Sequence, residues 1–167
     1  MPSRSDWIGV GPVTQLLPLP IGYLRKTEDN PRGIDQAYFA GVRAAFSSSF
    51  PDWAEANAKP YFTPDTSRAI VDWTLAMMTQ TSLQAAIELN VIQTSTDFRP
   101  ELARITLPTL VVHGDADASA PLEVTGRPTA QAIRGATLSI YEGAPHGLYF
   151  THQGRFNREL SSFVRAL

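Results

Sequence analysis

The sequence predicts an α/β fold with about three parallel strands, flanking helices and an inserted group of helices. Two short apolar runs, at 110–112 and 137–141, are each followed by a loop and then by a segment with helical spacing. The order strand, helix, strand, helix is typical of a parallel sheet. Residues 34–91 show helical patterns only, which predicts that helices are inserted between the first strand and the other two.

The composition describes a globular chain without an expected polyanionic partner. The 167 residues are 43% hydrophobic and 18% charged, and the formal net charge is −2. This charge offers no attraction to nucleic acid or to an anionic membrane surface. There is no cysteine, which excludes disulfides and thiolate metal sites. Because neither a secretory signal nor an apolar run of about 20 residues is evident, a cytoplasmic location without membrane contact is expected.

The first expected element is a strand at 7–13, an apolar run interrupted by glycines. Residues 1–21 are therefore predicted to form a strand and the lead-in of a core, and residues 22–97 a helical insertion. The strand would leave an apolar sheet edge if its neighbours are missing. Exposed edges promote pairing with other chains, so we expect self-association.

Four helices are expected in the insertion. Asp35 is placed to cap the first, Pro51 begins the second, Pro64 begins the third, and the fourth covers 82–91. The third carries an apolar face that favours packing in a core. The alternative is that this face lines a substrate pocket. The residues of this face are Trp73, Met77 and Met78.

Residues 98–167 are predicted to form the rest of the core. Besides the two strands, helices are expected at 122–133, ended by Gly135, and at about 153–166, where apolar residues recur at helical spacing. The carboxyl ends of parallel strands are where ligands gather in an open α/β sheet. The loops that follow the two strands are therefore the expected functional region.

Ionisable side chains occur in both loops. Asp115 and Asp117 follow the first strand, and His146 follows the second. An acid followed by a histidine is the order of the last two members of a hydrolase triad. In such a triad the carboxylate fixes the imidazole tautomer and stabilises the imidazolium. His113 is expected to support its loop, and His152 to cap a helix or to face solvent.

Both loops resemble the cofactor-free haloperoxidase and esterase branch of the α/β-hydrolases. The similarity lies in residues 106–117 and in the Glu-Gly-Ala-Pro-His-Gly-Leu string at 142–148. It continues upstream through residues 26–31 and the helical insertion, which matches the cap of that branch. The predicted fold is therefore a partial α/β-hydrolase.

The resemblance implies that His146 is the catalytic base and Asp117 the triad acid, with Asp115 as its rival. Leu148, directly after the histidine loop, joins the candidate pocket residues. The implied activity is hydrolysis of a carboxylic ester through an acyl-serine, with incidental peracid formation and halide oxidation. No organic or metal cofactor is implied. A metal site made of Asp115, Asp117 and His146 is the weaker alternative, since the resemblance explains the same residues without a metal.

The sequence departs from that branch at the nucleophile. Its members place a serine in a Gly-x-Ser-x-Gly elbow, whereas no serine here has glycine two positions before and two positions after it. The elbow and the oxyanion loop would precede Met1. We expect a carboxy-terminal portion that is inactive alone and acts on a small-molecule ester when an amino-terminal half completes it. The alternative is a non-catalytic binding or interaction module derived from a hydrolase.

Overall fold

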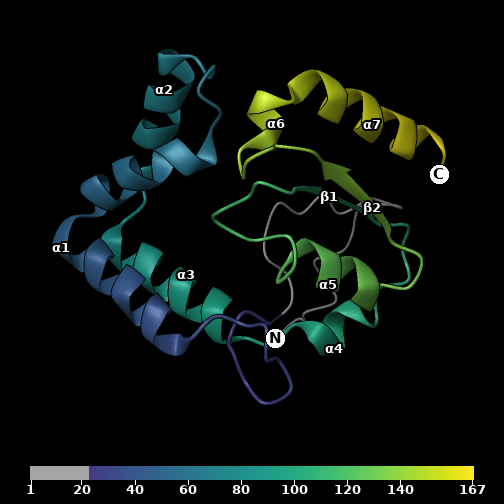
Figure 1. Cartoon of the computed structure of the whole chain (residues 1–167), viewed down its shortest axis with the longest axis horizontal. Coiled ribbons are helices and arrows are strands. Elements are labelled where there is room, and N and C mark those ends of the chain that lie inside the picture. Colours follow the sequence, from purple (N-terminus) through teal and green to yellow (C-terminus); the bar gives the residue numbers. More distant parts are fainter. Residues whose placement is uncertain (1–22) are drawn as a thin grey trace, which may run out of the picture.

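The computed structural model describes residues 23–167, in which helices and a small parallel sheet form two groups (Figure 1). In chain order the elements are α1 (Gln36–Tyr61), α2 (Arg68–Met78), α3 (Leu83–Ser95), α4 (Arg99–Leu102), β1 (Leu110–Gly114), α5 (Gly126–Ala132), β2 (Thr137–Tyr141), α6 (Leu148–Thr151) and α7 (Gln153–Arg165). Helices α1–α3 lie together on one side, and the remaining elements surround the sheet. The limits predicted for the helical insertion, residues 22–97, stay a prediction.

The two strands expected after residue 98 are confirmed. β1 and β2 are parallel, and their register runs from Leu110 opposite Thr137 to Gly114 opposite Tyr141. α5 and α7 lie on opposite sides of the pair (Figure 1). The strand expected at 7–13 lies outside the described residues, as does the sheet edge from which self-association was predicted.

The core centres on Tyr141, which is fully buried. Its ring packs with Leu110 and Val112 of β1, and phenylalanines of α7 cover this cluster. The Tyr141 hydroxyl donates to a carboxylate oxygen of Glu159 over 2.7 Å, and burial together with this bond raises the pKa of Tyr141 to about 12. The Arg155 guanidinium lies 3.6 Å from the ring centroid. Apolar packing and polar contacts therefore fix α7 on the sheet.

The two helices predicted around Pro51 form two halves of α1. Ser49 interrupts this helix with extended backbone angles (φ −159°, ψ 101°). The break falls two residues before Pro51, which has no N–H to donate and therefore interrupts the helical hydrogen bonds of this turn. Asp35 occupies the predicted N-cap position of α1, but its side chain makes no capping hydrogen bond.

Helices α2 and α3 begin at serine caps. The Ser67 hydroxyl accepts from the N–H of Ile70, so α2 starts at Arg68, later than the start predicted from Pro64. The Ser82 hydroxyl accepts from the N–H of Ala85 over 3.1 Å at the start of α3. Within residues 23–167, no helix combines the length and apolar character that crossing a membrane requires.

Helix α5 is shorter than the predicted helix over 122–133. Residues 122–125 form turns instead, and the Thr125 hydroxyl donates to the carbonyl oxygens of Ala120 and Pro121. A threonine side chain that binds nearby backbone competes with helical hydrogen bonding. The helix therefore begins at Gly126.

Candidate active site

The loops that follow β1 and β2 lie against each other at the carboxyl ends of the strands. The N–H of Asp115 donates to the carbonyl of Tyr141 over 3.1 Å, and the N–H of Ala116 donates to that of Ala144 over 3.2 Å. Gly114 permits this approach, since a Cβ atom there would overlap the Ala144 carbonyl. The first loop is therefore held against the segment that leads to His146.

Asp117 is a buried carboxylate with hydrogen bonds to both of its oxygens. Its side chain is 4% exposed. Oδ1 accepts from the N–H groups of Ser119 at 2.9 Å and Ala120 at 2.7 Å. Oδ2 lies 2.7 Å from Nδ1 of His146. These bonds compensate for the loss of hydration and fix the direction in which the carboxylate faces the imidazole.

His146 has one ring nitrogen bound and one left for chemistry. An ionised carboxylate only accepts hydrogen bonds, and opposite such a carboxylate Nδ1 would carry the proton of the bond to Asp117. Nε2 of the neutral ring is then an acceptor. The side chain is 20% exposed and lines a cavity. This arrangement can take a proton from an acidic group that approaches through the cavity.

Asp115, the alternative candidate for the triad acid, binds a backbone N–H group of the next loop. Its Oδ1 accepts from the N–H of Gly143 over 2.6 Å, and Gly143 has the positive φ of 66° that favours glycine. Asp115 thus stabilises the turn that precedes His146. Asp117 is the carboxylate that contacts the imidazole.

The other two histidines lie outside the cavity lining. Nε2 of His113 is 2.8 Å from the carbonyl oxygen of Ala120 and 3.4 Å from Oδ2 of Asp117, so His113 supports the acid loop as expected. His152 bonds Thr151 through Nδ1 and makes no side-chain cap on α7. Its ring packs on the edge of Tyr141.

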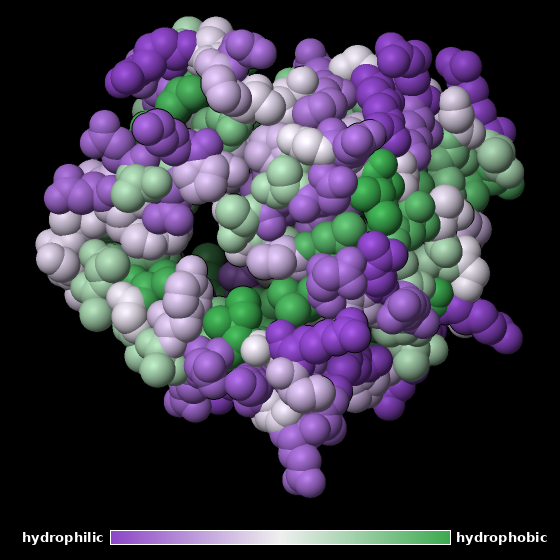
Figure 2. Space-filling view, viewed as in Figure 1, coloured by the Kyte–Doolittle hydropathy of each residue, from purple (hydrophilic) through white to green (hydrophobic). Residues whose placement is uncertain are grey.

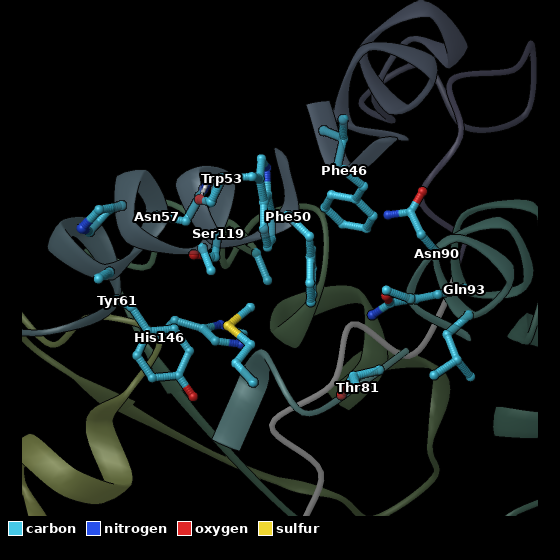
Figure 3. A pocket seen from close by; sticks show the side chains of 18 of the residues that line it. Phe46, Phe50, Trp53, Asn57, Tyr61, Thr81, Asn90, Gln93, Ser119 and His146 are labelled. Atoms are coloured by element: carbon cyan, nitrogen blue, oxygen red, sulfur yellow. Dashed lines mark hydrogen bonds between the residues drawn. The ribbon is translucent and has the colours of Figure 1, made fainter. Parts of the chain in front are cut away.

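A cavity of about 650 Å³ lies between α1–α3 and the acid–histidine loops. Figure 2 shows the surface hollowed between these two groups, with hydrophobic residues at the rim. The volume is in the range of small-molecule sites. Most lining side chains are apolar, and His146 and Ser119 lie among them (Figure 3). The aromatic lining residues are Tyr38, Phe39, Phe46, Phe50, Trp53, Tyr61 and Phe62.

The four predicted pocket residues separate into two pairs. Met77 and Met78 line the cavity, whereas Trp73 and Leu148 are not among its lining residues. Leu148 is buried in the core beside Tyr141. Helical spacing favoured core packing for the apolar face of α2. This prediction is wrong, because no residue of α2 is buried and Trp73 is 56% exposed. The reason is that one side of α2 packs on α1, while Met77 and Met78 face the cavity instead of a filled core.

Several cavity residues went unnoticed in the sequence. Phe46, Phe50 and Trp53 follow one another at spacings of four and three, the signature of one helix face, and their rings are in contact. Tyr61 carries no such signal. Its ring centroid lies 5.2 Å from that of His146, a contact between segments far apart in the chain.

The described residues contain no cluster of three or more His, Cys, Asp or Glu side chains suited to hold a metal ion. The three residues of the alternative metal site diverge, because Asp115 is bound to the Gly143 N–H. Asp117 and His146 are bound to each other. The geometry of this site is that of a hydrogen-bonded carboxylate–imidazole pair.

No protein-family model matches the chain, but related proteins do. A Synechocystis protein described as a non-heme chloroperoxidase is 35% identical over 151 residues, which cover 86% of this chain and 54% of that protein. A bifunctional esterase/perhydrolase of Acinetobacter calcoaceticus is 28% identical over 84% of this chain and 53% of that protein. The chain therefore spans about half the length of these relatives.

Solved structures show the same relationship. A bromoperoxidase from Bacillus anthracis superposes with a TM-score of 0.80 at 29% identity, over 86% of this chain and 54% of that one. An esterase from Exiguobacterium antarcticum has a TM-score of 0.78 at 20% identity, over 89% of this chain and 53% of that one. At that identity the esterase shows the shared fold alone.

Proposed function

Since this chain belongs to the haloperoxidase and esterase branch of the α/β-hydrolases, we propose that it supplies the acid and the base of a serine esterase. The observation that carries the proposal is the 2.7 Å contact between Nδ1 of His146 and Oδ2 of Asp117 at the wall of the cavity. It leaves Nε2 as the acceptor that a serine hydroxyl requires.

The chemistry proceeds in two acyl transfers. Nε2 of His146 takes the serine proton as the serine oxygen attacks the ester carbonyl, and the imidazolium then protonates the departing alcohol. Water repeats the sequence on the acyl-serine, which releases the carboxylic acid and restores the serine. Asp117 stabilises the imidazolium in both transfers.

We place the nucleophilic serine on a polypeptide segment outside these 167 residues, since none of their serines has the Gly-x-Ser-x-Gly context. The oxyanion donors next to such an elbow would come with it, and each is often worth about 3–4 kcal/mol. The chain alone is then inactive toward esters, and an amino-terminal half completes it.

The substrate class follows from the lining of the cavity. A largely apolar, aromatic wall of this size suits a small-molecule ester with an apolar acyl or alcohol group. Hydrogen peroxide in place of water would release a peracid from the acyl-serine, and that peracid would oxidise halide as a side reaction. The proposed reaction needs no organic or metal cofactor.

Complementation tests the proposal. The chain is mixed with the part of the Acinetobacter esterase/perhydrolase that has no counterpart in this chain, and hydrolysis of p-nitrophenyl acetate is followed. We expect hydrolysis in the mixture only, lost with His146→Ala and kept with His152→Ala. A mixture that associates yet stays inactive would favour the alternative, a non-catalytic interaction module.

Labelling of the chain alone tests the position of the serine. Intact mass after incubation with a fluorophosphonate is expected to show no adduct. Ser119 is the serine to examine first, since it lines the cavity with His146. An adduct abolished by both Ser119→Ala and His146→Ala would contradict an external nucleophile.

A further inference from the structure

We propose that Tyr61, the last residue of α1, is a positioning residue for His146, so that α1 takes part in aligning the base. The catalytic consequence rests on the proposed role of His146. The positioning itself can be measured without any hydrolysis. Three contacts carry it, through the backbone, the ring and the hydroxyl of Tyr61.

The backbone contact joins the end of α1 to the histidine loop. The carbonyl oxygen of Tyr61 accepts from the N–H of Gly147 over 2.9 Å, and Gly147 directly follows His146. A Cβ atom on Gly147 would lie 2.6 Å from that oxygen and 2.8 Å from two carbons of the Tyr61 ring. Only glycine allows so close an approach without a shift of the backbone. The helix end and the residue after the base are thus directly packed.

The ring contact acts on the imidazole itself. The centroids of the Tyr61 and His146 rings are 5.2 Å apart, and the ring planes are inclined by 60°. Both residues lie at one end of the cavity in Figure 3. The bond from Nδ1 to Asp117 requires one orientation of the imidazole about its Cβ–Cγ bond. A phenol ring packed beside it opposes rotation away from that orientation.

The hydroxyl contact holds the phenol ring in place. The Tyr61 hydroxyl is hydrogen-bonded to the hydroxyl of Tyr149 in α6. Burial, then the bond to Tyr149, then the negative charge of Asp117 raise the pKa of Tyr61 well above its ordinary value. The phenol therefore stays neutral at any pH at which a histidine can act as a base. The hydrogen bond between the Tyr61 and Tyr149 hydroxyls persists under the same conditions. Tyr61 is fixed at its backbone by the loop and at its hydroxyl by α6.

Coupling of this kind has a functional meaning. Tyr61 belongs to the same helix as Phe46, Phe50 and Trp53, which line the cavity. Tyr61 itself lines the cavity, so a substrate that contacts it would act on the same side chain that packs on His146. The alignment of the base would then depend on what occupies the cavity.

Proton NMR of the chain alone tests the proposal, because only three histidines contribute Cε1–H signals. The signal of His146 is identified by its loss in His146→Gln. Tyr61→Leu removes the neighbouring ring current, so we expect the His146 signal to shift more than those of His113 and His152. Tyr23→Leu, at a tyrosine that is not among the residues lining the cavity, is the matched control and is expected to leave the His146 signal in place.

The hydroxyl pair provides a second, conservative test. Tyr61→Phe and Tyr149→Phe break the same bond, so both single variants and the double variant should shift the His146 signal by the same amount. If circular dichroism shows that Tyr61→Leu does not fold, the Tyr61→Phe and Tyr149→Phe variants still test the proposal. The proposal is overturned if the His146 signal stays in place, if all three signals move equally, or if the two Phe effects add. Failure of the proposed function would appear differently, as an inactive complementation mixture in which the His146 signal still responds to Tyr61.

Discussion

The acid–histidine loops and the helices α2 and α3 are packed in contrasting ways. In the loops, Asp117 is 4% exposed, and hydrogen bonds reach both of its carboxylate oxygens. In α2 no residue is buried. Large apolar residues of the two helices are exposed instead. They are Trp73, Met77, Leu83, Leu89, Val91 and Ile92.

The contrast follows from the number of neighbours on each side. The loops are enclosed by the sheet, by the end of α1 and by α6, whereas α2 and α3 pack on α1 and border the cavity. Packing free energy is therefore concentrated around the candidate acid and base. The helices contribute a cavity wall, and their exposed apolar side chains add little to stability.

The largest expected effect separates the two aspartates of the acid loop. In the complemented enzyme, Asp117→Asn should lower kcat by roughly 10⁴-fold, because an amide can present its NH₂ group to the imidazole and favour the wrong tautomer. Asp115→Asn should have a much smaller effect, since that carboxylate binds the Gly143 N–H. Initial rates of p-nitrophenyl acetate hydrolysis measure both. A greater loss with Asp115→Asn would reverse the assignment of the acid.

The next effect compares one leucine from each region. Leu110 is 3% exposed in the core and Leu89 is 60% exposed on α3. Leu110→Ala should lower the free energy of unfolding by about 2–5 kcal/mol, and Leu89→Ala by less than about 0.5 kcal/mol. Urea unfolding followed by circular dichroism measures the difference. Equal losses would contradict the contrast in packing between the two regions.

A pair of glycines sharpens the comparison further. A Cβ on Gly114 would overlap the Ala144 carbonyl, whereas a Cβ on Gly41 in α1 meets nothing within 4 Å. Gly114→Ala should destabilise the chain by about 1–3 kcal/mol. Gly41→Ala should stabilise it by about 0.5–1 kcal/mol, because alanine is the better helix former. Destabilisation by both, in the same unfolding experiment, would contradict this account of the loop.

The smallest expected effect lies at the surface, where Arg99 bridges Asp97 and Asp29. Hydrogen bonds from Arg99 lower the pKa of Asp97 below its ordinary value of 3.8. A lowered folded-state pKa stabilises the chain above pH 3.8 and loses that contribution as the pH falls through the folded value. Arg99→Gln should therefore slightly lower the free energy of unfolding near neutral pH. It should also make that free energy fall less steeply as the pH decreases. Arg134→Gln, at another exposed arginine, is the control; identical acid profiles for Arg99→Gln and the unaltered chain would refute the effect.

The sequence predicted those features that depend on local patterns. The apolar run at 110–112, with its two β-branched valines, is enough to predict β1. The order of Asp117 and His146 after two strands is enough to place both side chains at one edge of the sheet. The start of α5 was missed because the Thr125 hydroxyl binds backbone carbonyls that a helical pattern does not reveal.

Contacts between distant segments could not be predicted. The place of Tyr61 beside His146 depends on where α1 breaks, at Ser49, and on how its second half meets the histidine loop. The exposure of Trp73 depends likewise on what α2 packs against. A periodic apolar face shows that a helix has one preferred side, and leaves open whether that side meets a core or a cavity.

The tautomer of His146 tests the central claim most directly. Long-range ¹H–¹⁵N correlation of the chain alone, at a pH where the imidazole is neutral, shows which ring nitrogen carries the proton. The account predicts a proton on Nδ1 in the unaltered chain and in Asp115→Asn, and a change toward Nε2 in Asp117→Asn. A proton on Nε2 in the unaltered chain would contradict the acid–base pair. The same tautomer in Asp117→Asn as in the unaltered chain would contradict it as well.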